Sequence, residues 1–340
     1  VLKTNDKGLF CEALTSGKLS NHKGVNIPDK SLDMEYLSET DKSDLLFGIK
    51  KDVDFVAASF MRKKEDALAL KEFLSNNGGN SIKIIAKIEN LEGIENFEDI
   101  LENVEGIMVA RGDMGVEIDY EKLPGIQKKI IRRCREAGKI VITATQMLES
   151  MIENPMPTRA EITDVANAVF QGTSAVMLSA ESAAGQYPVE SVVAMSKIII
   201  QSEKDFELYG DKYSESEKIR EDITNAVGHG ATTIAKDVKA KALIAITKAG
   251  YTASKMSRFR PSVPIIGQTP DRKVFHQMAL LWGVHPVILE EVSDLETLFQ
   301  RAVDNSLKTN LVSKGDMVVI TAGVPVGKVG STNSIRVEKV

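Results

Sequence analysis

The feature that most constrains this chain is a repeated alternation of short apolar runs with amphipathic segments between residues 53 and 204. Near-continuous apolar strands separated by helices predict a parallel sheet covered on both faces, and so an α/β fold. The predicted strands are Val53–Phe60, Ile82–Glu89, Gly106–Asp113, Lys139–Thr145 and Ala175–Ser179. The predicted helices are Lys63–Asn76, Gly93–Leu101, Lys122–Ala137, Thr158–Gln171 and Val189–Glu203.

Polar residues stand at the end of every predicted strand. A doubly wound sheet gathers its chemistry at one switch point, whereas a (β/α)8 barrel places polar groups at the C-terminal end of each strand. The pattern therefore favours a (β/α)8 TIM barrel. Only five such strands are predicted, which correspond to strands 4–8 of a barrel, and the chain begins with Val1 rather than Met. We therefore expect a partial barrel and missing N-terminal sequence.

Two neighbouring strand ends carry charges of opposite sign. Residues two apart on a strand share a face, so Lys87 and Glu89 are expected to project together, and Asp113 stands at the end of the next strand. An ammonium group beside two carboxylates suits a hard divalent cation and a phosphorylated, anionic substrate. The less specific interpretation, salt-bridge partners at strand ends, stays open at this point.

The polar stretch 205–218 ends the first pattern, and a second α/β pattern follows it. We predict three parts: residues 1–27 as a remnant of a β-rich lid domain, residues 28–204 as the C-terminal part of the barrel, and residues 205–340 as an α/β domain with a mostly parallel sheet.

Composition excludes several classes of function. The formal net charge is −5, so the chain lacks the basic footprint of a nucleic-acid-binding protein. No apolar run is long enough to span a bilayer, so no membrane partner is expected. Two cysteines argue for a reducing compartment, and we predict a cytoplasmic protein.

Seven motifs then resemble the bacterial type of the pyruvate kinase family, in the order in which that family carries them. They are Lys23–Pro28 (KGVNIP), Lys87–Asn90 (KIEN), Met108–Glu117 (MVARGDMGVE), Ala144–Met151 (ATQMLESM), Pro157–Glu161 (PTRAE), Asp164–Ala168 (DVANA) and Met177–Glu181 (MLSAE). The resemblance covers essentially the whole chain but lacks the family's N-terminal part. Ser179-Ala-Glu-Ser182 departs slightly from the family's usual Ser-Gly-Glu-Thr.

The resemblance implies transfer of the phosphoryl group of phosphoenolpyruvate to ADP, giving pyruvate and ATP, as in glycolysis. It implies that Glu89 and Asp113 bind Mg²⁺ or Mn²⁺ and that Lys87 steadies the transferring phosphoryl group, since this reaction needs positioning and charge neutralisation. Gly112 and Asp113 would offer backbone N–H groups to the substrate carboxylate. Thr145 would contact the substrate and take part in protonation of the enolate, and Ser179 would help that relay through water.

Further sites follow from the same resemblance. Lys23 is similar to a lid lysine that reaches the nucleotide, and any K⁺ ligands would lie in the missing N-terminal part. In the C-terminal region, hydroxyl groups, backbone N–H groups and one lysine would bind the phosphate of an allosteric effector. These residues are Thr247, Lys248, Ala249, Gly250, Tyr251 and Thr252, with Gly327, Gly330 and Ser331 in a closing loop. Family members are commonly tetramers, so a homotetramer is expected.

Two alternatives remain at this stage. One is a metal-dependent TIM-barrel lyase or aldolase that acts on phosphoenolpyruvate or pyruvate. The other is a fragment that binds an effector and assembles without turning over substrate. Because the family's N-terminal substrate and cation ligands are not in this sequence, we expect the 340-residue chain by itself to be nearly inactive.

Overall fold

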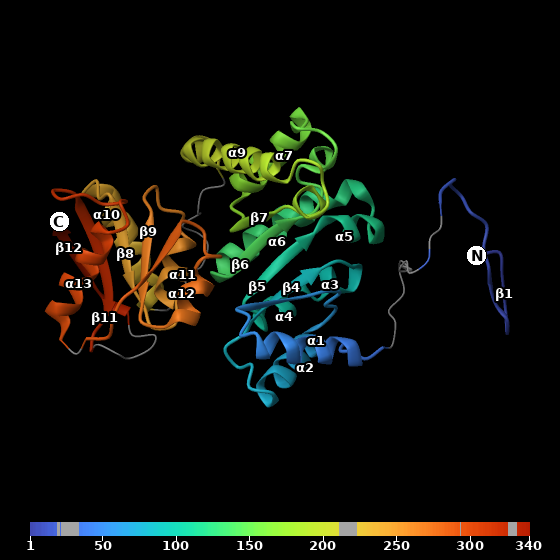
Figure 1. The fold of residues 1–340 in the computed structure, drawn as a ribbon, viewed down its shortest axis with the longest axis horizontal. Coiled ribbons are helices and arrows are strands. Elements are labelled where there is room, and N and C mark those ends of the chain that lie inside the picture. The colour runs from blue at the N-terminus through green and yellow to red at the C-terminus, as the bar shows by residue number, and fades with distance from the viewer. Residues whose placement is uncertain (19–20, 22–33, 211–222, 293, 326–331) are drawn as a thin grey trace.

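The computed structural model describes residues 1–18, 21, 34–210, 223–292, 294–325 and 332–340. Figure 1 shows a barrel-like α/β part in the middle and a second α/β part that contains the C-terminus. A two-stranded antiparallel hairpin, β1 (Lys3–Asn5) and β2 (Gly8–Phe10), precedes them. The described part of the predicted lid remnant is therefore β-structured, and the three predicted domain boundaries stay predictions.

The first large sheet has five parallel strands in the order β3-β4-β5-β6-β7. Each strand lies beside the strand that precedes it in the sequence, so the order never reverses. A doubly wound sheet would require a reversal. The sequential order confirms the predicted arrangement of a partial (β/α)8 barrel. These strands are β3 (Phe55–Ala58), β4 (Lys83–Ile88), β5 (Gly106–Ala110), β6 (Ile140–Ala144) and β7 (Ala175–Met177).

Helices pack against the outer face of this sheet. Because strand side chains alternate, Ile84 and Ile88 of β4 join the outer core, whereas Ile85 belongs to the inner face. The helices of this part are α1 (Glu39–Lys50), α2 (Lys64–Asn76), α3 (Leu91–Glu95), α4 (Phe97–Glu102), α5 (Arg111–Glu117), α6 (Leu123–Ala137), α7 (Arg159–Gln171), α8 (Ala180–Ala183) and α9 (Pro188–Tyr209), with 3₁₀ turns η1 (Tyr120–Lys122) and η2 (Glu149–Ile152).

Three of these elements differ from the predictions. Helix α1 is not predicted from the sequence. The predicted helix 93–101 is two helices, because Asn96 leaves the helical conformation and donates its side-chain amide to the Arg62 carbonyl at 3.0 Å. The strand predicted to reach Asp113 ends at Ala110, and helix α5 begins at Arg111. Asp113 therefore lies in the first turn of a helix, not on a strand.

The second large sheet has the order β10-β9-β8-β11-β12, and only β12 is antiparallel to its neighbour. This confirms a mostly parallel sheet. The order runs outward in two directions from β8 and β11, so a topological switch point lies between them. The elements are β8 (Ala242–Ile246), β9 (Ile265–Thr269), β10 (Val284–Ile288), β11 (Met317–Gly323), β12 (Thr332–Lys339), α10 (Ile223–Asp237), α11 (Tyr251–Ser257), α12 (Arg272–Met278) and α13 (Leu295–Leu307).

The C-terminal part packs against the N-terminal ends of the barrel strands. Gln277 donates its side-chain amide to the Ser81 carbonyl at 2.7 Å, just before β4, and Ser254 donates to the Gly138 carbonyl at 3.0 Å, before β6. Leu280 and Leu281 pack against the inner face of the barrel sheet. The described residues of the C-terminal part therefore do not cover the C-terminal ends of these strands, where the predicted metal- and substrate-binding residues lie. Among the described helices, none combines the length and apolarity that crossing a membrane would require.

Candidate active site

The predicted pairing of Lys87 and Glu89 is present at the end of β4. The Lys87 ammonium lies 2.7 Å from Glu89 Oε1 and donates to the Ser59 hydroxyl at 2.8 Å. Lys87 shares the inner face with Ile85, which confirms that the period of two brings the two charges together. Ser59 comes from the loop after β3, so two neighbouring strand ends meet here.

Glu89 is fully buried, with 0% of its surface exposed. Its Oε2 atom accepts the backbone N–H of Phe60, a residue with φ of 51° that turns this N–H toward the carboxylate. Its Oε1 atom contacts Lys87 as an ion pair but receives no aligned hydrogen bond within the described part of the chain. A buried carboxylate oxygen with an unused lone pair fits a cation that approaches from the strand ends.

Tyr36 is a site residue that the sequence analysis missed. Its hydroxyl donates to the Ser59 carbonyl at 3.0 Å. Burial raises the pKa of this phenol, and the negative charges of Asp66 and Glu89 raise it further. The phenol therefore stays protonated and serves as a donor that fixes the loop after β3. No spacing or motif around Tyr36 indicates this role, because the contact joins segments that are distant in sequence.

Asp113 lies in the first turn of helix α5, which directly follows β5. Strands β4 and β5 pair in parallel, with Ile88 opposite Val109, so the segments that carry Glu89 and Asp113 leave the sheet side by side. The described residues contain no cluster of three or more His, Cys, Asp or Glu side chains that could hold a metal ion. A metal here would depend on two carboxylates and on substrate oxygens, which is the ligand pattern typical of Mg²⁺.

The loop after β6 brings Thr145 against the start of α5. The Gly112 N–H donates to Thr145 Oγ1 at 2.7 Å, and Thr145 Oγ1 donates to the Ala144 carbonyl at 2.6 Å. The structure thus brings two predicted site residues, Gly112 and Thr145, into direct contact. Because the Gly112 N–H is engaged, a substrate carboxylate would have to replace the threonine hydroxyl to use it.

Ser179 lies at the start of α8, and its position depends on Glu181. Glu181 is 2% exposed, and its two oxygens accept the N–H groups of Leu148 at 3.1 Å and Ser179 at 2.7 Å. One buried carboxylate therefore ties the loop after β6 to the loop after β7. Glu181 is the last residue of the motif Met177–Glu181, but the sequence predicts no role for it.

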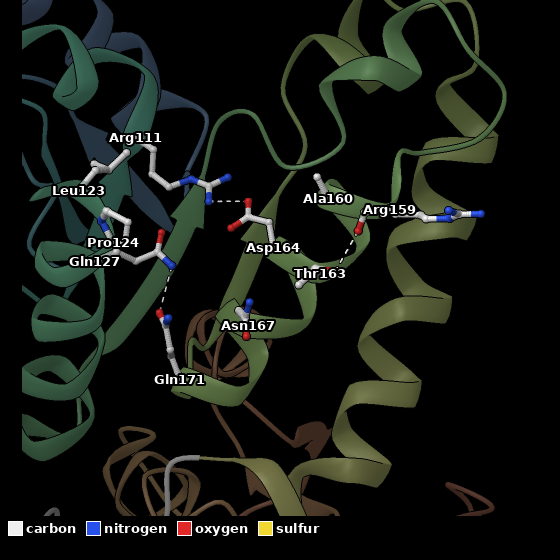
Figure 2. Close-up of a pocket in the computed structure, with 10 residues that line it drawn as sticks. All are labelled: Arg111, Leu123, Pro124, Gln127, Arg159, Ala160, Thr163, Asp164, Asn167 and Gln171. Carbon is white, nitrogen blue, oxygen red and sulfur yellow. Dashed lines mark hydrogen bonds and ion pairs between the residues drawn. The ribbon is translucent and has the colours of Figure 1, made fainter. Parts of the chain in front are cut away.

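A pocket of about 660 Å³ lies behind this site, between α6 and α7 (Figure 2). It is lined by Arg111, Leu123, Pro124, Gln127, Arg159, Ala160, Thr163, Asp164, Asn167 and Gln171. Figure 2 shows the Arg111 guanidinium meeting the Asp164 carboxylate across it, at 2.6 Å. None of the residues predicted to bind metal or substrate lines this pocket.

The predicted effector loop occupies the turn from β8 into α11. Gly250 has φ of 78°, a left-handed conformation that glycine adopts without strain. Thr247 and Thr252 are buried, and the Thr252 hydroxyl lies 2.5 Å from that of Thr332. Lys248 pairs with Glu291 at 3.5 Å. Ala249 and Tyr251 are exposed between them.

Four predicted site residues lie outside the described residues. These are Lys23, Gly327, Gly330 and Ser331. The loop that contains the last three follows β11, the strand beside β8, so the segments that carry the two predicted halves of the effector site leave neighbouring strands of one sheet.

Comparison with known proteins identifies the family. A model described as "Pyruvate kinase, barrel domain" matches residues 1–192, and one described as "Pyruvate kinase, alpha/beta domain" matches residues 225–338. The chain belongs to the pyruvate kinase family. This membership supports the predicted phosphotransferase and not the lyase alternative.

Curated pyruvate kinases resemble the chain throughout its length. That of Clostridium acetobutylicum is 47% identical over 334 residues, which are 98% of this chain and 70% of the relative. Those of Sporosarcina psychrophila and Geobacillus stearothermophilus are each 46% identical over 324 residues, which are 95% of this chain and 55% of the relative. The chain thus spans 55–70% of the length of these pyruvate kinases.

Proposed function

We propose that the whole protein catalyses the pyruvate kinase reaction, phosphoryl transfer from phosphoenolpyruvate to ADP to give pyruvate and ATP. The observation that carries this proposal is the ion pair between Lys87 and the buried Glu89, beside the segment of Asp113. The pair places a fixed cation next to one carboxylate at the end of β4, and the next strand leads into the segment of a second carboxylate, Asp113. Phosphoryl transfer depends on such charge neutralisation and positioning.

Each residue has a role in this proposal. Glu89 and Asp113 hold Mg²⁺ or Mn²⁺, which neutralises charge on the substrate oxygens when it is bound. Lys87, anchored by Ser59, presents its ammonium to the phosphoryl group. Thr145 and Ser179 hold the proton path to the enolate carbon, and the N–H groups of Gly112 and Asp113 receive the substrate carboxylate.

Metal binding by the chain tests the first part of this proposal without any turnover. Mn²⁺ titration followed by electron paramagnetic resonance is expected to show a site that Glu89→Gln weakens at least about tenfold, a loss of about 1.4 kcal/mol. Glu95→Gln, at an exposed glutamate of α3, serves as the matched control and should leave the affinity unchanged. Equal affinity in the wild type and Glu89→Gln would contradict the proposed metal site.

Formation of ATP from ADP and phosphoenolpyruvate tests the reaction itself. We expect the full reading frame to turn over and Lys87→Met in that frame to lose nearly all activity. The 340-residue chain is expected to bind Mn²⁺ but to turn over little. A full-length protein that binds Mn²⁺ at Glu89 yet forms no ATP would contradict the reaction and leave the metal site intact.

We also propose that the C-terminal part binds a phosphorylated effector beside Thr247, Lys248 and Gly250. The supporting observation is the switch point between β8 and β11, because ligands of open α/β sheets bind at the C-terminal ends of strands where the order reverses. Calorimetric titration with a panel of sugar phosphates and nucleotides tests this. Binding that survives unchanged in both Thr247→Ala and Lys248→Ala would contradict it.

The proposed setting is a cytoplasmic homotetramer that uses Mg²⁺ or Mn²⁺, with K⁺ as a further requirement. Two free cysteines support a reducing compartment, one of them the fully buried Cys134. Sedimentation of the full reading frame tests the assembly, and assays with and without K⁺ test the monovalent cation.

A further inference from the structure

The loop after β6 holds two consecutive residues in the left-handed region. Thr145 has φ of 66° and Gln146 has φ of 54°. A β-branched residue such as threonine is an outlier there, because its side chain crowds the backbone. Such conformations persist at functional sites only when surrounding contacts hold them. The left-handed conformations of Thr145 and Gln146 therefore require stabilising contacts from neighbouring elements.

One guanidinium group meets the turn at several atoms. Arg111 Nη2 donates to the Thr145 carbonyl at 2.6 Å, and Nε lies 3.2 Å from the same oxygen and 3.3 Å from the Ala144 carbonyl. Nη2 also lies 2.8 Å from Met147 Sδ. Arg111 is only 7% exposed. Its planar fork of donors therefore fixes the carbonyl direction that a left-handed Thr145 requires.

The same guanidinium is anchored from the opposite side. Its Nη1 atom donates to Asp164 Oδ2 at 2.6 Å, from helix α7 (Figure 2). Arg111 directly precedes Gly112, whose N–H donates to the Thr145 hydroxyl. The first residues of α5 thus bind the turn at two points. The Arg111 side chain donates to the Thr145 carbonyl, and the Gly112 backbone N–H donates to the Thr145 hydroxyl.

We propose that Arg111 is the positioning residue for Thr145: it holds the strained turn that aims the threonine hydroxyl at Gly112 and the substrate carboxylate position. The importance of that aim rests on the proposed function, but the positioning itself is a property of the chain. A purely structural Arg111 would stabilise the fold without controlling the conformation of the turn.

The Gly112 amide signal of glycine-labelled protein, observed by NMR without ligands, separates these possibilities. Arg111→Lys keeps the charge but loses the fork. We expect the Gly112 proton to move upfield and to exchange with solvent at least about tenfold faster, because its bond to Thr145 opens. Adding Gln146→Gly should restore the signal, since glycine adopts the left-handed conformation without strain.

Lys239→Gly is the matched control, since Lys239 is also exposed and left-handed, with φ of 52°, but lies far away on the C-terminal part. It should restore nothing. An unchanged Gly112 signal in Arg111→Lys overturns the proposal. A shifted signal also overturns it if Gln146→Gly fails to restore the wild-type position, or if Lys239→Gly restores it equally well. If Arg111→Lys does not fold, Asp164→Asn takes its place with the same criteria and a smaller shift.

These measurements use no metal, substrate or turnover. Failure of the Mn²⁺ titration would contradict the proposed function and leave the role of Arg111 standing. An unchanged Gly112 signal would remove the role of Arg111 and leave the metal site standing.

Discussion

The two five-stranded sheets of this molecule place their binding residues by different means. The barrel sheet keeps its strands in sequence order and has polar residues after successive strands, whereas the C-terminal sheet reverses its order between β8 and β11. The loops differ as well. After β3 and β6 the barrel uses Phe60 and Thr145 in left-handed conformations, and after β8 the C-terminal sheet uses Gly250.

This difference shows where the chain tolerates strain. Glycine adopts the left-handed conformation without strain, so the turn after β8 needs few stabilising hydrogen bonds. A left-handed threonine is strained, so buried groups must stabilise its backbone conformation. In this turn the Thr145 hydroxyl accepts the Gly112 N–H. In the barrel, Arg111 at the start of α5 donates to the Thr145 carbonyl, and the carboxylate of Glu181 in α8 accepts the Leu148 N–H of the same loop.

The largest expected effect comes from removing such a buried carboxylate. Glu181→Gln replaces one carboxylate oxygen by an NH2 group, so the N–H of either Leu148 or Ser179 loses its acceptor. An unsatisfied buried donor costs about 1–3 kcal/mol, so we expect a loss of about 2 kcal/mol in the free energy of unfolding, measured with urea. Glu149→Gln, at an exposed glutamate of η2, should cost almost nothing. Equal losses in the two variants would contradict the bridging role.

A substitution at Gly250 tests the other side of the comparison. Alanine there would have φ of 78°, which costs about 1–2 kcal/mol, although its nearest neighbours lie no closer than 3.4 Å. Gly125→Ala in α6, with open space around it, should instead stabilise by about 0.5–1 kcal/mol. Thermal unfolding of both variants measures the difference. Similar shifts in the same direction would show that the turn after β8 is not constrained.

Glu161 makes part of the barrel sensitive to acid. Burial alone would raise the pKa of its carboxyl, but hydrogen bonds from Ser150 and Thr158 outweigh burial and lower the pKa below 4.5. The stabilisation is therefore complete above about pH 4.5 and is lost as the pH falls through the lower, folded-state pKa. Glu161→Gln should cost about 1 kcal/mol at pH 7 and progressively less below pH 4.5. A cost that is constant down to pH 3 would contradict this.

The smallest effect is expected at the barrel surface. Arg133 donates to both oxygens of Glu98 at 2.9 Å, and this bond lowers the pKa of the Glu98 carboxyl. Because the Glu98 side chain is 52% exposed, solvent screens the pair, and Glu98→Gln should cost about 0.5 kcal/mol at pH 7. The cost should vanish as the pH falls through the folded-state pKa, and shrink in 1 M salt. A cost above that of Glu161→Gln would reverse the expected order.

Part of the site could be predicted because Lys87 and Glu89 are close together in the sequence. The two-residue period of a strand places Lys87 and Glu89 on one face, whatever surrounds them, and the structure pairs them at 2.7 Å. The alternation of apolar runs likewise predicts the barrel-like order of β3 to β7. The prediction that β5 reaches Asp113 was wrong by contrast: the strand ends at Ala110, and α5 begins at Arg111, whose side chain contacts the loop after β6.

What the sequence by itself determined is therefore the alternation of strands and helices in the barrel part, the family motifs and the charges that one strand carries. Only the tertiary structure decided the conformation of Thr145, the engagement of the Gly112 N–H and the places of Tyr36 and Glu181. The physical reason is separation along the chain. Gly112 meets Thr145 across 33 residues and Arg111 meets Asp164 across 53, so no local pattern encodes these bonds, and packing of neighbouring βα units brings them together.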